Sequence, residues 1–131
     1  MTGAGGSVAP RMAWRLLLVE DSDDDAELIR LSLEQAGLAA AISRVSRRED
    51  LCRCLEEGGW DAVVCDHHLP DLDSLRALEL VAARQAGLPF ILVSGAIPDE
   101  LAAEVLRRGA RDFISKGDLG KLPAALGREL S

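Results

Sequence analysis

Short apolar runs alternate with amphipathic helical patterns along the chain, and this alternation limits the possible folds more than any other feature. The strand-like runs cover residues 15–19, 38–45, 60–65, 89–93 and 111–115, and the helical patterns cover residues 23–36, 48–56, 74–84, 98–108 and 122–130. Strands that alternate with helices pair in parallel and are joined by right-handed crossovers. The sequence therefore predicts an α/β fold: a doubly wound, five-stranded parallel sheet with helices on both faces.

The size and composition of the chain fit one folded domain. Of its 131 residues 48% are hydrophobic and only 3% are aromatic, so the core is expected to consist mainly of aliphatic side chains. Residues 1–13 have neither the charged start nor the apolar centre of a signal peptide and are predicted to be a disordered tail. Residues 14–131 are predicted to form the single folded domain.

The net charge of −7 disfavours two classes of partner. Direct nucleic-acid binding needs Lys and Arg side chains on the phosphates, and anionic membrane surfaces attract the same side chains. No apolar run is long enough to span a membrane. The three cysteines show no spacing typical of a disulfide framework or a zinc site, which favours reduced thiols and a cytoplasmic location.

Polar side chains stand where four of the five predicted strands end. Glu20 and Asp21 follow the first strand, Asp66 follows the third, Ser94 follows the fourth and Lys116 follows the fifth. In doubly wound sheets the ligand site lies beyond the carboxyl ends of the strands. These residues are therefore expected to meet in one pocket, although intervals of 45, 28 and 22 residues separate Asp21, Asp66, Ser94 and Lys116 along the chain.

The residue types in this pocket indicate phosphoryl transfer assisted by magnesium. Neighbouring carboxylates repel one another, and Mg²⁺ relieves that repulsion because it binds one or two carboxylates together with water and phosphate oxygens. Lys116 supplies a positive charge, and Ser94 a hydroxyl donor, for the oxygens of a phosphoryl group in transfer. Asp66 is best placed to be the nucleophile, because it stands alone at its strand end and is followed by a loop.

With these strand-end residues the chain resembles the receiver domains of response regulators in two-component signalling, from about residue 14 to residue 130. Pro70 stands four residues after Asp66, as in that family, and residues 109–113 (Gly-Ala-Arg-Asp-Phe) resemble the family's Gly-Ala-x-Asp-aromatic motif. The resemblance implies the flavodoxin-like three-layer sandwich. It also implies a phosphorelay switch that is not an enzyme beyond its own phosphorylation and dephosphorylation.

The resemblance assigns a chemical role to five residues of the pocket. Asp66 would accept a phosphoryl group from a histidine kinase or a phosphotransfer protein. Magnesium would be bound by Asp21, Asp66 and the backbone carbonyl of His68, with Glu20 acting mostly through water. Lys116 would pair with the phosphoryl group.

Two further residues would turn phosphorylation into a signal. Ser94 would hydrogen-bond the phosphoryl group, and Phe113 would be the aromatic switch that turns inward when Ser94 moves. The face formed by the fourth predicted helix, the fifth strand and the fifth helix would present the change, and a homodimer is possible through it. Gly117 follows Lys116 where the family often has proline, so the last loop is expected to be more flexible.

Two alternative functions are compatible with parts of the sequence. Asp21-Ser22-Asp23, with a later Ser and Lys, also resembles a haloacid-dehalogenase-like phosphatase in which Asp21 would be the nucleophile, but this leaves Asp66 without a role. The second alternative is a phosphorylation-independent interaction module on the same fold.

Three acids that follow this strand end have a local explanation. They are interpreted as helix-start acids that interact with the helix dipole: Asp23, Asp24 and Asp25.

Overall fold

The computed structural model describes residues 13–130, so the tail predicted for residues 1–13 lies outside the described residues except for Ala13. The strands are β2 (Trp14–Val19), β3 (Ala40–Val45), β4 (Ala62–Cys65), β5 (Phe90–Ser94) and β6 (Asp112–Ser115). The helices are α1 (Asp23–Gln35), α2 (Arg48–Glu57), α3 (Ser74–Arg84), α4 (Asp99–Arg107) and α5 (Leu122–Leu130), with the 3-10 helix η2 (Lys116–Lys121) before α5. Within this part of the chain, no helix has both the length and the apolar character needed to cross a membrane.

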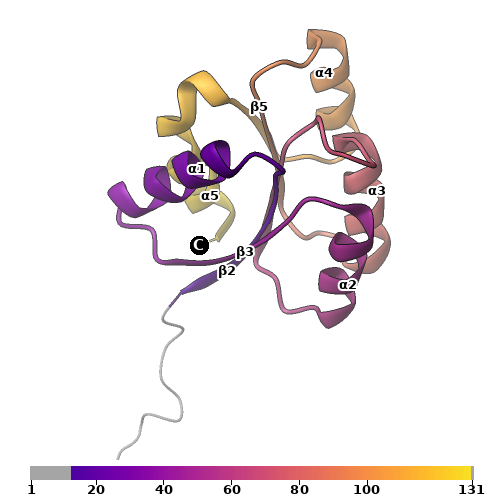
Figure 1. Cartoon of the computed structure of the whole chain (residues 1–131), viewed down its shortest axis with the longest axis horizontal. Coiled ribbons are helices and arrows are strands. Elements are labelled where there is room, and N and C mark those ends of the chain that lie inside the picture. The colour runs from indigo at the N-terminus through magenta and orange to yellow at the C-terminus, as the bar shows by residue number, and fades with distance from the viewer. Residues whose placement is uncertain (1–12, 131) are drawn as a thin grey trace, which may run out of the picture.

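The strands form one parallel sheet in the order β3-β2-β4-β5-β6. Helices α1 and α5 cover one face of this sheet, and α2, α3 and α4 cover the other (Figure 1). Successive side chains of a strand point to opposite faces. In β2, Leu16 and Leu18 pack with α1 and α5, whereas Leu17 and Val19 pack with the other three helices. The arrangement confirms the predicted doubly wound, three-layer fold.

The strand register aligns the carboxyl ends of four strands at one edge of the sheet. Val19, the last residue of β2, pairs with Cys65 at the end of β4, and Cys65 pairs with Leu92 in β5. Ser94 at the end of β5 pairs with Ser115 at the end of β6. The residues that come next along the chain therefore emerge at this edge: Glu20 after β2, Asp66 after β4 and Lys116 after β6.

Two strands, β3 and β4, begin two residues later than their apolar patterns predict. β3 begins at Ala40 rather than at residue 38, because Gly37, with a φ of 76°, and Leu38 complete the turn that ends α1. β4 begins two residues after Trp60, because this side chain is buried against α2 and its Nε1–H donates to the carbonyl oxygen of Cys54 at 2.7 Å. The apolar character of both segments thus comes from helix packing rather than from strand pairing.

At the opposite edge of the sheet, Arg15 fixes the chain where it enters β4. The Arg15 guanidinium carbon lies 4.4 Å from the centre of the Trp60 ring. The same guanidinium donates to the carbonyl oxygens of Gly58 and Gly59 at 3.1 and 3.2 Å. Gly59 has a φ of 83°, which a residue with a side chain rarely adopts. The start of β4 is thereby held against the start of β2.

Candidate functional site

The ammonium of Lys116 is the centre of the strand-end pocket. Its Nζ lies 2.6 Å from Asp25 Oδ2, 2.9 Å from Asp66 Oδ2 and 2.9 Å from Glu20 Oε1. The side chains of Glu20 and Asp66 are buried, and that of Lys116 is only 17% exposed. Burial alone would lower the pKa of Lys116, but the contacts with Asp25, Asp66 and Glu20 outweigh it and raise the pKa above its usual value. The pocket therefore holds a permanent positive charge.

Glu20, Asp21 and Asp66 come together as predicted, and they are suited to bind a divalent cation. One carboxylate oxygen from each of the three lies within 4.8 Å of the others. Among the described residues none donates a hydrogen bond to the buried Glu20 Oε1, although Lys116 Nζ is close enough to form an ion pair. Mg²⁺ prefers such carboxylate oxygens and completes its shell with water. The donor set therefore fits the predicted magnesium ion.

Backbone hydrogen bonds fix Glu20 and Asp66, and Arg44 adds a further contact to Glu20. The N–H of Glu20 donates to the Val45 carbonyl at 2.9 Å, and the N–H of Asp66 donates to the Val19 carbonyl at 2.9 Å. Arg44 in β3 donates through Nε to the Glu20 carbonyl at 2.9 Å. Both carboxylates are thus set on backbone that continues the sheet hydrogen bonding, which leaves little freedom in their positions.

The Glu20 carboxylate is less acidic than a free glutamate. Burial raises the pKa of Glu20, its contacts with Lys116 and the Ser22 N–H lower it in part, and the neighbouring Asp66 raises it further. The pKa of Glu20 in the folded protein therefore lies above its value in the unfolded chain, and ionised Glu20 reduces stability. A cation bound by these acids would offset this cost.

We expect Glu20→Gln to stabilise the metal-free protein at neutral pH by about 1 kcal/mol. This difference in the free energy of unfolding should shrink as the pH falls through the raised pKa of Glu20, because the wild-type side chain then becomes neutral as well. Urea unfolding of both proteins in a chelator, at a series of pH values, measures this difference. Added Mg²⁺ should reverse the order, because it stabilises the protein that binds it more tightly. A variant less stable than the wild type in chelator at neutral pH would contradict the prediction.

Ser94 ends β5, and Phe113 lies within the neighbouring strand β6. The Ser94 side chain is buried, and its Oγ has no hydrogen-bond partner within residues 13–130. Phe113, in β6, is partly buried and packs against the cluster of apolar side chains beneath α2, α3 and α4. A buried hydroxyl without a partner is rare. Ser94 is therefore available to donate to a new oxygen at the strand ends.

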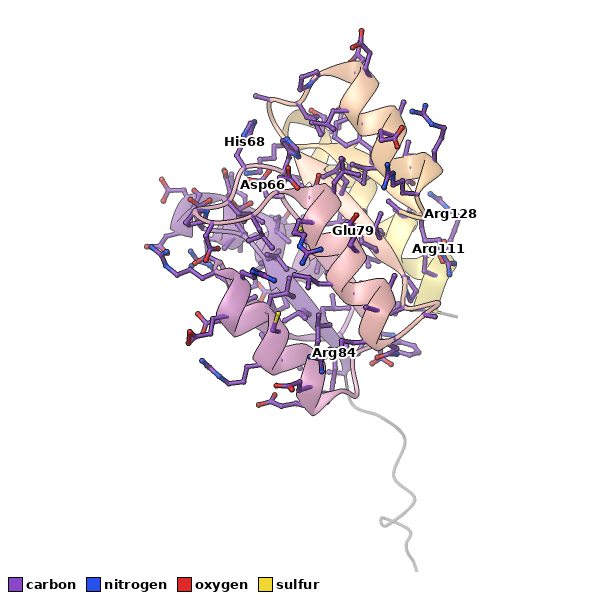
Figure 2. All side chains as sticks on the ribbon, turned by 90° about the vertical axis from the view of Figure 1, so that its right-hand side faces the viewer. Asp66, His68, Glu79, Arg84, Arg111 and Arg128 are labelled. Atoms are coloured by element: carbon purple, nitrogen blue, oxygen red, sulfur yellow. The ribbon has the colours of Figure 1, made fainter. Side chains whose placement is uncertain are left out.

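The two histidines after Asp66 have different surroundings. The side chain of His68 points outward near Asp66 (Figure 2). His68 is exposed, and its Nε2 lies 2.6 Å from the Ala96 carbonyl oxygen, where a ring N–H donates across the mouth of the pocket. His67 is buried, and its Nδ1 lies 2.7 Å from Ser74 Oγ at the start of α3. Burial lowers the pKa of His67. The role of the His68 backbone carbonyl as a metal ligand stays a prediction.

Asp25 is the residue of this pocket that the sequence interpretation missed. The sequence predicts only a helix-start acid here, and the Asp25 N–H does donate to the capping Ser22 Oγ at 3.2 Å. Its carboxylate, however, makes the shortest contact with Lys116. Asp25 lies in the first turn of α1, which begins four residues after the last residue of β2, and this position is the signal that could have placed it at the same edge.

The matches to known proteins agree with one another. A family model described as the response regulator receiver domain matches residues 16–126. The C4-dicarboxylate transport transcriptional regulatory protein DctD of Pseudomonas aeruginosa is 32% identical over 102 residues, which are 78% of this chain and 22% of DctD. The two-component response regulator ORR21 of Oryza sativa subsp. japonica is 31% identical over 113 residues, which are 86% of this chain and 16% of ORR21. The chain thus spans about a fifth of the length of these relatives.

Solved structures show the same architecture. The receiver domain of the sensor histidine kinase PA1611 from Pseudomonas aeruginosa, with a magnesium ion coordinated in its active site cleft, has a TM-score of 0.76 and 25% identity. The comparison covers 90% of this chain and 98% of that one. The BeF3-activated DrrB receiver domain has a TM-score of 0.77 and 22% identity, with 91% and 98% covered. This second likeness concerns the fold alone.

Proposed function

Because the chain belongs to the family of response regulator receiver domains, we propose that it is a phosphoacceptor switch whose acceptor is Asp66. One observation supports this assignment above all: the Lys116 ammonium is 2.9 Å from the Asp66 carboxylate, beside the acids Glu20 and Asp21. The family is one of signalling domains. The haloacid-dehalogenase-like phosphatase and the phosphorylation-independent module are not favoured.

In the proposed reaction an Asp66 carboxylate oxygen attacks the phosphorus atom of a phosphohistidine on a histidine kinase or phosphotransfer protein. The new oxygen–phosphorus bond forms as the phosphorus–nitrogen bond breaks, and the imidazole leaves with that electron pair and takes a proton from solvent. Lys116 is placed to neutralise charge on the phosphoryl oxygens, which is the main protein contribution to such transfers. Hydrolysis by water returns Asp66 and inorganic phosphate.

Glu20, Asp21, Asp66 and the His68 carbonyl are proposed to hold the magnesium ion. When bound, the ion supplies positive charge for the phosphoryl oxygens during transfer. Asp21 is exposed and therefore accessible for direct ligation. Glu20 is proposed to act mostly through water, as the family resemblance implies. The spread of the three acids, within 4.8 Å of one another, supports a single shared ion.

Signal readout is proposed to run from Ser94 to Phe113 and on to the face formed by α4, β6 and α5. Ser94 Oγ would donate to the phosphoryl group, and Phe113 would move into the space that Ser94 vacates. The face carries the exposed Leu106 and the ion pair between Arg128 and Asp112, at 3.1 Å. A second copy of the chain is the proposed partner there.

Two parts of the proposal concern the chain as a whole. Residues 14–131 are proposed to be the receiver domain, with chemistry limited to gaining and losing its own phosphoryl group. The cytoplasm is the proposed location, because free thiols persist there and Cys52, Cys54 and Cys65 are free.

The proposal is tested by incubating the full chain with Mg²⁺ and acetyl phosphate and measuring its intact mass. We expect one phosphoryl adduct per chain, located by peptide mapping on the peptide that contains Asp66. With a chelator in place of Mg²⁺ the adduct should be absent, because Glu20 and Asp66 then repel the incoming phosphate. An adduct on another residue would refute the assignment of Asp66. A folded chain that gains no adduct would favour the interaction module.

A further inference from the structure

Asp25 stands apart from the other acids around Lys116. Its Oδ2 is 2.6 Å from Lys116 Nζ, and the side chain is one-third exposed at the mouth of the pocket. It comes from the first turn of α1, whereas Lys116 begins η2, so the contact joins segments that lie 91 residues apart. Its carboxylate is not one of the three whose oxygens gather within 4.8 Å.

The ammonium of Lys116 has three N–H groups and three carboxylate neighbours. Two of these neighbours, Glu20 and Asp66, also belong to the acidic cluster that fits a divalent cation. A cation on that cluster draws on the same two carboxylates and weakens their attraction for Lys116. Asp25 is then the anion whose charge is not shared, and it keeps the ammonium beside Asp66.

We propose that Asp25 is a positioning residue for phosphoryl transfer: it holds the Lys116 ammonium beside Asp66 while the other two carboxylates face the cation. The inference rests on the function proposed for Asp66. The contact of Lys116 with Asp25, at 2.6 Å, is shorter than its contacts with Asp66 and Glu20, both at 2.9 Å. The α1 helix fixes Asp25 in turn, because Ser22 Oγ accepts the Asp25 N–H and caps the helix start.

The first measurement compares phosphorylation rates of the full chain and its variants. The initial rate of adduct formation is followed by intact mass against acetyl phosphate concentration at saturating Mg²⁺. We expect Asp25→Asn to lower the maximal rate about fivefold, which is the upper range for an ion pair with one partner one-third exposed. The half-saturating Mg²⁺ concentration should change less than about twofold. Asp25→Glu, which keeps the charge on the same helical turn, should restore the rate to within about twofold of the wild type.

The neighbouring acid Asp24 provides the matched control. Asp24→Asn removes the same charge from the same turn of α1, but Asp24 is exposed and is not among the carboxylates around Lys116. We expect its maximal rate to stay within about twofold of the wild type, because an exposed charge is screened by solvent. Equal slowing in Asp24→Asn and Asp25→Asn would overturn the proposal, since it would show a general effect of acidic charge.

The second measurement follows the ammonium itself and does not need the reaction. The chain contains only two lysines, Lys116 and Lys121, so protein labelled with 15N-lysine gives two side-chain ammonium signals. Lys121 is 73% exposed and serves as the internal reference. We expect the Lys116 ammonium to exchange slowly with solvent in the wild type, with and without Mg²⁺. In Asp25→Asn its exchange should become several-fold faster, most clearly with Mg²⁺ present, while that of Lys121 stays the same.

The two measurements separate this inference from the function proposed for Asp66. If the wild type gains no adduct at Asp66, the proposed function fails, and the ammonium signals still show whether Asp25 holds Lys116. If the adduct forms normally, an unchanged rate in Asp25→Asn overturns the positioning role. An unchanged Lys116 signal in that variant overturns it as well.

Discussion

Replacing Asp66 with Asn is expected to abolish phosphorylation of the chain completely. The amide oxygen of Asn is a far weaker nucleophile than a carboxylate, and the pocket loses one of the acids that fit the cation. The fold should persist, because the substitution also removes the repulsion between Asp66 and the buried Glu20. Intact mass after incubation with Mg²⁺ and acetyl phosphate, together with circular dichroism of the variant, measures both outcomes.

Asp21→Asn is the comparison that separates the nucleophile from a metal ligand. This variant keeps the Asp66 carboxylate, so raising the Mg²⁺ concentration should recover part of the adduct, whereas no concentration should recover it in Asp66→Asn. The proposed acceptor is wrong if Asp66→Asn still gains the phosphoryl group. The opposite result would be an Asp21→Asn variant that is inert at all Mg²⁺ concentrations and an Asp66→Asn variant that is active. It would favour the haloacid-dehalogenase-like phosphatase with Asp21 as the nucleophile.

Lys116→Met is expected to have two large effects. The rate of phosphorylation should fall by about 100-fold, because the pocket loses the charge that neutralises the phosphoryl oxygens. The metal-free protein should lose about 3 kcal/mol of stability, because Glu20, Asp66 and Asp25 then face one another without a cation. Urea unfolding in chelator measures the loss, and Mg²⁺ should restore part of it.

Two further lysine variants test this explanation. Lys116→Arg keeps the positive charge and should restore most of the stability, but not the rate, because the planar guanidinium does not reproduce a compact ammonium. Lys121→Met removes an exposed lysine whose ion pair with Asp118 spans 3.8 Å, and it should change neither quantity measurably. Equal phosphorylation rates for Lys116→Met and the wild type would show that Lys116 takes no part in the reaction.

The layered fold was predictable because β2, β4 and β5 are buried on both faces, so their sequences are continuous apolar runs. The edge strand β3 was harder to delimit. Its side chains alternate between half-buried and exposed, and it begins with two alanines, which favour strands weakly. The 3-10 helix η2 left no apolar pattern, because none of its side chains is buried. Two contacts hold it in place: Ser32 Oγ–H donates to the Leu119 carbonyl at 2.7 Å, and the partly buried Leu119 side chain packs against the core.

Ligand sites of doubly wound sheets lie beyond the carboxyl ends of the strands, and this rule predicted from the sequence that Glu20, Asp21, Asp66 and Lys116 meet. The structure places these four residues within contact distances. Asp25 was missed because acids at a helix start already have a sufficient local explanation. The buried pair His67–Ser74 was missed for a different reason. Its hydrogen bond joins a loop to α3, and only the path of the chain between them decides that these two side chains meet.

The position of Trp60, packed against Arg15, also determines what the intrinsic fluorescence of this protein can report. The chain has no tyrosine and two tryptophans, Trp14 and Trp60, so its fluorescence comes from two indoles. Both stand where strands begin, and six residues of extended chain, roughly 20 Å, separate Trp60 from Asp66. Intrinsic fluorescence will therefore follow global unfolding and stay nearly silent during phosphorylation. An optical sensor of the switch needs an indole introduced at the carboxyl ends of the strands.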